Sequence, residues 1–229
     1  RPPRPRGARA RLHPSGSCAG VWGSQAALTC AAVAVLPGPI GGPVDPAAVE
    51  ARLREDVGNE IRSILVVLAD TATGVRNDIA AIRRAIDAAG HPALLMVDAI
   101  ASLGCDRYEM DEWGVDITVS ASQKGLMTPP GLGLVWANDR AIAAHERADA
   151  RVGYFDWSSR RNVEAHYQLY NGTPPIPLLY GLREALDMLA DEGLENAWAR
   201  HETLARAVWA AVDAWHTPDG LRCTIADPA

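Results

Sequence analysis

The chain has 229 residues, of which 48% are hydrophobic, and its 22 Lys and Arg against 28 Asp and Glu give a net charge of −6. The apolar fraction is typical of a folded protein rather than a disordered chain, and an acidic chain lacks the excess of cations on which nucleic-acid binding depends. The longest uncharged apolar run, residues 26–36, is shorter than the ~18 residues needed to cross a bilayer. We therefore expect a folded cytoplasmic protein whose partners include neither nucleic acid nor a membrane.

The first 43 residues differ in composition from the rest of the chain. They contain five arginines and no acidic residue, and residues 1–11 (RPPRPRGARAR) are interrupted by proline and glycine. This composition predicts an irregular start over residues 1–43. An Arg-rich segment without acidic residues is also typical of an organelle-targeting peptide, which stays open as an alternative to a cytoplasmic location.

From residue 44 onward the hydrophobic pattern alternates between helix and strand spacing. Helices are predicted at residues 47–53, 78–89, 141–150, 176–190 and 194–215, and apolar runs of strand length lie at 64–68, 94–97, 115–119 and 132–136. Wholly apolar strands that alternate with helices indicate a parallel sheet that is covered on both faces. The sequence therefore predicts an α/β fold with a mostly parallel sheet and helices on both of its faces.

Polar residues follow three of the predicted strands. Asp70 and Thr71 follow the first, Asp98 ends the second, and Gln123 and Lys124 follow the third. Ligands of open α/β sheets bind beyond the carboxyl ends of the strands, so these side chains indicate a site. Asp98 as a helix cap is the structural alternative.

Lys124 is the only lysine among the 22 basic residues. An arginine cannot replace a lysine whose amine must lose its proton and attack a carbon, because the guanidinium stays charged. A lysine amine and a carboxylate at neighbouring strand ends suit pyridoxal 5′-phosphate, since the amine binds the aldehyde and the acid holds the ring nitrogen protonated. A solvated loop cation is the alternative for Lys124.

The four cysteines do not form a recognisable metal site. Cys18, Cys30, Cys105 and Cys223 show neither a CxxC pair nor another ligand spacing. We therefore expect small buried hydrophobic residues at these positions, and no metal.

Four stretches together resemble the class V aminotransferases, and within them the serine–glyoxylate and alanine–glyoxylate group. They are VDAIASLG at 97–104, DEWGVD at 111–116, SQKGLM at 122–127 and PPGLG at 129–133. The resemblance covers residues 44–215 and implies the fold of the fold-type I large domain. It implies a partial pyridoxal-phosphate-binding large domain at 44–193 and the helical start of a truncated small C-terminal domain at 194–229. It also identifies the chain as a fragment.

The resemblance assigns roles to the residues of the predicted rim. Lys124 matches the Schiff-base lysine, which also moves a proton, and Asp98 matches the partner of the pyridinium nitrogen. Ile100 lies against one face of the ring, Gln123 contacts the phosphate or the ring hydroxyl, and Thr71 is a small hydroxyl residue near the cofactor. An ordinary core aliphatic is the alternative for Ile100.

The resemblance further implies a homodimer with shared active sites. Tyr170 and Thr173 match positions that reach across the interface to the phosphate of the partner subunit; a packing aromatic before a turn is the alternative for Tyr170. The chain departs from the family at Leu68 and Ala69, where a His-Asn pair is usual. The Gly/Ser-rich phosphate turn has a disturbed counterpart at 15–28, and the arginine for the substrate carboxylate is missing.

The resemblance implies a transaminase that moves an amino group from serine or alanine to glyoxylate and produces glycine. Its substrates are amino acids and 2-oxo acids. Two alternatives remain open: another class V transaminase, acting on ureidoglycine or aminoethylphosphonate, and a remnant of the family without catalytic activity.

Overall fold

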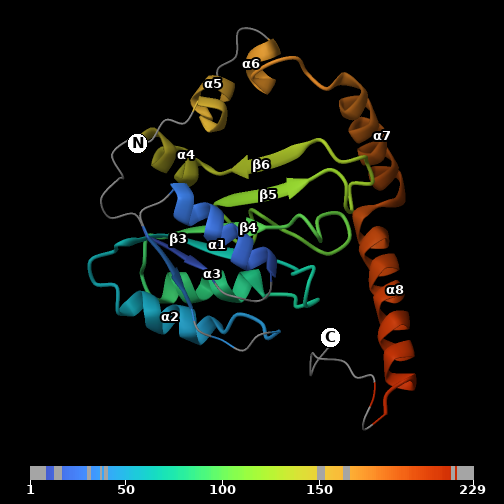
Figure 1. The fold of residues 1–229 in the computed structure, drawn as a ribbon, viewed down its shortest axis with the longest axis horizontal. Helices are drawn as coiled ribbons and strands as arrows, with labels where there is room; N and C mark the ends of the chain where they lie inside the picture. Colours follow the sequence, from blue (N-terminus) through green and yellow to red (C-terminus); the bar gives the residue numbers. More distant parts are fainter. Residues whose placement is uncertain are drawn as a thin grey trace.

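One six-stranded sheet organises the chain (Figure 1). The computed structural model describes residues 9–12, 17–29, 32–36, 38, 41–148, 153–161, 166–217 and 220. The strands are β1 (Arg9–Leu12), β2 (Ala32–Val35), β3 (Ile61–Val67), β4 (Leu94–Asp98), β5 (Ile117–Ala121) and β6 (Gly133–Ala137). Their order in the sheet is β2-β1-β3-β4-β5-β6.

All neighbouring strands are parallel except the last pair. Val67 of β3 pairs with Asp98 of β4, which pairs in turn with Val119 of β5, so these three strands end close to one edge of the sheet. β6 runs antiparallel to β5. Residues 122–132 connect the two strands without a helix, and a parallel connection needs a longer crossover. The prediction of a mostly parallel sheet is confirmed.

Helices cover both faces of the sheet, as predicted. The helices of the described residues are α1 (Ser17–Thr29), α2 (Pro46–Arg54), α3 (Ile79–Ala88), α4 (Asp139–Glu146), the 3₁₀ turn η1 (Gly153–Phe155), α5 (Ser158–Arg161), α6 (His166–Tyr170), α7 (Ile176–Glu192) and α8 (Leu194–Ala214), of which α1 packs on one face and α2 and α3 pack on the other. Among the described residues, no helix is both long and apolar enough to span a membrane.

The two faces of β3 carry two separate cores, because successive side chains of a strand point to opposite faces. Ile64 and Val66 pack in the larger core with α2 and α3. Leu65 and Val67 pack with Ala19 of α1 and with Met96 of β4. Asp98 lies two residues after Met96 and therefore belongs to the face that α1 covers.

Side-chain caps explain where three of the predicted helices begin. Asp45 accepts a hydrogen bond from the Ala47 amide, and Asp78 accepts one from the Ala81 amide. Asn138 caps α4 in the same way. Each cap satisfies an amide that the first turn of a helix leaves without a partner. The predicted extension of α4 to residues 149–150 lies outside the described residues.

The start of the chain differs from the prediction. We expected an irregular segment over residues 1–43, but β1, α1 and β2 lie within it. β1 pairs with β3 on one side and with β2 on the other. The stabilising partner of β1 is therefore a strand some fifty residues later in the chain, and local composition carries no signal for such a pairing.

Candidate functional site

The carboxyl ends of β3, β4 and β5 form one rim of the sheet, which we call the carboxyl rim. The backbone ladder continues past the strands here, since the Leu68 amide donates to the Asp98 carbonyl (2.8 Å) and the Ala99 amide to the Val119 carbonyl (2.9 Å). These bonds hold the loops after the three strands in fixed positions. The predicted residues Thr71, Asp98 and Lys124 all lie on these strand ends or in these loops.

Asp98 is a half-buried carboxylate with little compensation for its charge. Its Oδ1 accepts one hydrogen bond from the Ile100 amide (2.9 Å). Among the described residues, no cation pairs with it and Oδ2 has no partner. Burial raises the pKa of the Asp98 carboxyl; the hydrogen bond from Ile100 lowers it in part, and the charge of Asp70 raises it further. A cation placed beside Oδ2 would reverse this penalty.

Lys124 lies in a closed loop between β5 and β6. The Met127 amide donates to the Lys124 carbonyl (2.9 Å), and the Thr128 amide donates to the Ser122 carbonyl (3.1 Å). The Thr128 hydroxyl donates to the same Ser122 carbonyl (2.9 Å). The Lys124 side chain is exposed and its amine has no partner within the described part of the chain. It is available to a ligand at the carboxyl rim.

Asp70 is a second carboxylate at the carboxyl rim, but both of its side-chain oxygens already accept hydrogen bonds. It is 1% exposed, and its Oδ1 accepts hydrogen bonds from the amides of Ala72 (2.8 Å) and Thr73 (3.3 Å). Its Oδ2 accepts from the Cys18 amide at the beginning of α1 (3.2 Å). Asp70 therefore holds the N-terminal end of α1 against the loop after β3. The positive end of a helix dipole attracts anions.

The structure brings most of the predicted site residues to this rim. Thr71 and Gln123 are exposed there, on the loops after β3 and β5, and Ile100 is half-buried directly after β4. Ser15 and Gly16 of the predicted phosphate turn lie outside the described residues. The roles of all these residues stay predictions.

Tyr170 and Thr173 do not join the rim within the same chain. Tyr170 ends α6, which lies beyond the β6 edge of the sheet rather than at the ends of β3 and β4 (Figure 1). Tyr170 is half-buried and Thr173 is exposed. Their predicted contact with the phosphate of a second copy stays a prediction.

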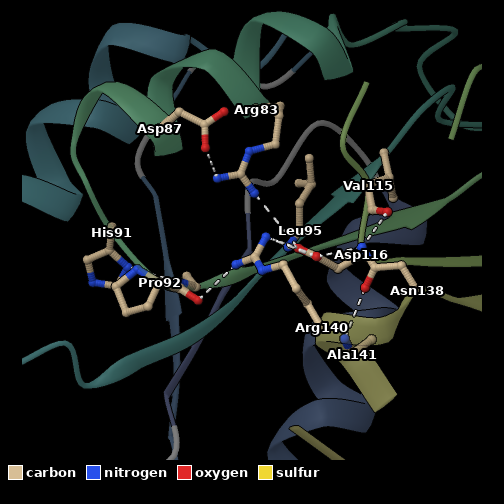
Figure 2. Close-up of polar contacts among 11 residues, drawn as sticks. Arg83, Asp87, His91, Pro92, Leu95, Val115, Asp116, Asn138, Arg140 and Ala141 are labelled. Carbon is tan, nitrogen blue, oxygen red and sulfur yellow. Dashed lines mark hydrogen bonds and ion pairs between the residues drawn. The ribbon is translucent and has the colours of Figure 1, made fainter. Parts of the chain in front are cut away.

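A buried ionic network at the opposite end of the sheet was missed by the sequence analysis (Figure 2). Asp116, directly before β5, is fully buried and accepts hydrogen bonds from the Leu95 amide (2.8 Å) and Asn138 Nδ2 (2.9 Å). Arg140 Nη1 donates to its Oδ1 (3.0 Å), and Arg83 Nη1 lies 3.8 Å from its Oδ2. The network joins α3, β4, β5 and α4. The motif DEWGVD contains Asp116, but no local pattern identifies its partners.

Three chemical features therefore belong to the carboxyl rim: a free amine, an uncompensated carboxylate and the N-terminal end of a helix. Together these groups suit a ligand that has an electrophilic carbon, a basic ring nitrogen and an anionic group. Pyridoxal 5′-phosphate has all three, so the donor set fits this cofactor.

Comparison with known proteins agrees with this geometry. The family model for aminotransferase class-V matches residues 17–224. The chain is 50% identical to the serine–glyoxylate aminotransferase of Methylorubrum extorquens over 177 residues, which are 74% of this chain and 43% of that protein. It is 49% identical to the L-aspartate–glyoxylate aminotransferase of Paracoccus denitrificans over 165 residues, 71% of this chain and 41% of that protein.

A solved structure shows the same arrangement of elements. The alanine–glyoxylate aminotransferase from Nostoc sp. superimposes with a TM-score of 0.84 at 28% identity, over 96% of this chain and 57% of that one. The chain thus spans less than half of the length of the two curated relatives that it matches. The family match and these identities establish that the chain belongs to the class V aminotransferases.

Proposed function

We propose that the chain is the cofactor-binding part of a transaminase that moves an amino group from serine or alanine to glyoxylate and produces glycine. The observation that carries the proposal is that the free Lys124 amine and the uncompensated Asp98 carboxylate belong to one rim of the sheet. Relatives that act on glyoxylate support the acceptor. Their names give different amino donors, so the donor rests on the sequence resemblance alone.

Six of the chain's own features would hold pyridoxal 5′-phosphate. Lys124 would bind its aldehyde covalently, Asp98 Oδ2 would accept a hydrogen bond from its protonated ring nitrogen, and the N-terminal end of α1 would bind its phosphate. Ile100 packs against the ring, while Thr71 and Gln123 supply polar contacts around it.

Bound cofactor supplies an electron-poor ring, which accepts the electron pair that the amino acid releases with its α-proton. Asp98 keeps the ring nitrogen protonated, because a carboxylate beside a cation stabilises it. With the substrate in place, the Lys124 amine would take the α-proton and hold it for return to the cofactor. The Lys124 loop is closed by hydrogen bonds, which keep the amine near the reacting atoms.

We propose further that two copies share each active site. Tyr170 and Thr173 lie off the rim of their own chain, and Thr173 is exposed, so both are available to the phosphate in a second copy. Such an arrangement makes each subunit incomplete alone. Mixing a Lys124→Ala chain with a Tyr170→Ala chain should yield activity above that of either variant. Activity no higher than that of the separate variants would contradict sharing. The cytoplasmic location stays a prediction.

Titration of the purified chain with pyridoxal 5′-phosphate tests the proposal directly. We expect a near-visible absorbance band from cofactor linked to Lys124, and its loss in Lys124→Arg, which keeps the charge but cannot form the link. Serine, alanine and aspartate are then compared as amino donors to glyoxylate. A wild-type chain that shows no band at saturating cofactor would contradict the proposal and favour a remnant without catalytic activity.

A further inference from the structure

Two loops of the carboxyl rim touch each other through glycines. Gly104 lies in the turn after β4, and Gly125 directly follows Lys124 after β5. A Cβ atom on Gly125 would lie 2.2 Å from the Leu103 carbonyl oxygen and 2.7 Å from Cys105 Sγ. A Cβ atom on Gly104 would lie 2.9 Å from the Gly125 carbonyl oxygen. Since carbon contacts normally lie at about 3.5–4.0 Å, the loops pack with no room for either methyl group.

The backbone conformation of Gly104 strengthens this requirement. Its φ is +87°, which places it in the left-handed region where side chains are strained. Gly104 is therefore needed both for its turn and for its contact with Gly125. We call this backbone contact the glycine interlock.

The turn that carries Gly104 is tied to Asp98. The Ile100 amide donates to Asp98 Oδ1 (2.9 Å), and the Leu103 amide donates to the Ala99 carbonyl (2.9 Å). The Cys105 amide then donates to the Ser102 carbonyl (2.8 Å). These bonds run without a gap from Asp98 to the interlock, so the position of Gly104 is set relative to Asp98.

The loop that carries Gly125 is closed on itself by its bonds to Ser122 and Lys124. Those bonds fix the shape of the loop, but they do not join it to the β4 turn. The glycine interlock does, and Leu126 continues the contact by packing with Leu103, Leu189 and Ala197.

We propose that Gly104 and Gly125 are positioning residues, whose interlock sets the distance between the Lys124 amine and the ring-binding carboxylate Asp98. The inference rests on the proposed function, because it concerns the covalent attachment of pyridoxal 5′-phosphate. The gap between 2.2 Å and a normal contact means that a methyl group at Gly125 must displace the loop by about 1 Å. A displacement of about 1 Å can reduce a rate about 100-fold.

The test compares Gly125→Ala with Gly133→Ala. Gly133 lies on β6 nearby, and a Cβ atom there would meet nothing within 4 Å. The first readout is the rate at which the absorbance of Lys124-linked cofactor appears. The second is the affinity for pyridoxine 5′-phosphate, which has the ring and the phosphate but no aldehyde, and the third is thermal unfolding without cofactor.

We expect Gly125→Ala to attach the cofactor about 100-fold more slowly while it binds pyridoxine 5′-phosphate within about threefold of the wild type. Gly133→Ala should match the wild type in its rate of attachment and in its affinity for pyridoxine 5′-phosphate. Attachment by Gly125→Ala at the wild-type rate would overturn the inference and leave the proposed function intact. A wild-type chain that never attaches cofactor would overturn both.

A second variant keeps the inference testable if Gly125→Ala does not fold. Cys105→Gly combined with Gly125→Ala removes the sulfur from the crowded contact and leaves the Leu103 carbonyl. We expect this double variant to attach cofactor at least about tenfold more slowly than Cys105→Gly alone. Equal rates in the double variant and in Cys105→Gly would overturn the inference.

Discussion

Asp98 and Asp116 lie at opposite ends of two neighbouring strands, and their surroundings differ in kind. Asp116 is fully buried, and a backbone amide, an asparagine and an arginine all donate to it. Asp98 is half-buried and accepts one hydrogen bond, from Ile100. Among the described residues, Asp116 has two arginines within 4 Å and Asp98 has none.

The difference separates a carboxylate whose charge is compensated within the fold from one whose charge is not, as the proposed role of Asp98 requires. A buried charge is tolerated when it is paired and fully hydrogen-bonded. Asp98 breaks that rule, and its pKa is raised as a result, first by burial. An unpaired carboxyl group whose pKa is raised by burial is a candidate for a functional site.

The largest expected effect is the loss of stability on removal of the Asp116 carboxylate. Asp116→Ala leaves Arg140 and the Leu95 amide without their acceptor and should lower the free energy of unfolding by about 3–5 kcal/mol. Urea unfolding followed by circular dichroism measures it. The control is Asp111→Ala, an exposed aspartate five residues earlier, which should change stability by less than about 0.5 kcal/mol. A loss of less than about 1 kcal/mol in Asp116→Ala would show that Asp116 does not stabilise the fold in the way that distinguishes it from Asp98.

Asp98→Asn should show the opposite pattern, with function lost and no loss of stability. Without the carboxylate, the ring nitrogen of the cofactor loses its partner, and removal of the α-proton of serine should slow by about 10²–10³-fold. Deuterium incorporation into serine in D₂O measures this step. Exchange near the wild-type rate would mean that Asp98 serves only to hold the turn at Ile100.

Asp70 belongs to the same rim as Asp98, but both of its side-chain oxygens accept hydrogen bonds, as those of Asp116 do. It therefore separates the effect of position from the effect of hydrogen bonding. Asp70→Ala deprives three amides, those of Cys18, Ala72 and Thr73, of their acceptor. The cost should be about 1–3 kcal/mol, with faster hydrogen exchange at the beginning of α1. Asp70→Asn keeps one oxygen acceptor and should lose less. Unchanged exchange in α1 would show that Asp70 does not hold this helix.

The smallest expected effect is a pair of opposite pH dependences. The raised pKa of Asp98 means that its contribution to stability is fully present below pH 3.8 and is lost as the pH rises through the folded value. Asp98→Asn should therefore gain stability over the wild type as the pH rises above about 3.8.

Asp56 should show the opposite pH dependence, because its pKa is lowered. Burial raises the pKa of its carboxyl, but hydrogen bonds from the Ile61 and Glu60 amides and from His91 outweigh burial and lower it. Its contribution is present above pH 3.8 and is lost as the pH falls through the lower folded value. Urea unfolding of the wild type, Asp98→Asn and Asp56→Asn between pH 2 and 7 measures both pH dependences, which should have opposite signs. Equal slopes in the three proteins would contradict these assignments.

Sequence patterns predicted the elements whose signals are local. Ile79, Ile82 and Ile86 give the spacing of α3, and Asp78 marks its beginning. The direction of β6 follows from its short connection to β5, but its apolar composition alone does not reveal it. β1 was missed because its stability comes from pairing with β3.

In the candidate site too, only the residues with a local sequence signal could be predicted. Asp98 and Lys124 could be located because they follow strands in a regular alternation of elements. The partners that hold them could not, because they are distant in the chain. The Cys18 amide that binds Asp70 lies 52 residues before it, and the contact of Gly104 with Gly125 joins two loops separated by β5.

The central claim is that the Lys124 amine is the covalent attachment point for a cofactor at the carboxyl rim. The most direct test is borohydride reduction of the chain with pyridoxal 5′-phosphate, followed by peptide mapping by mass spectrometry. Lys124 is the only lysine, so the adduct should appear on the peptide that contains it and disappear in Lys124→Arg, apart from the N-terminal amine. An adduct confined to the N-terminal amine, or no more abundant in the folded wild type than in urea, would contradict the claim.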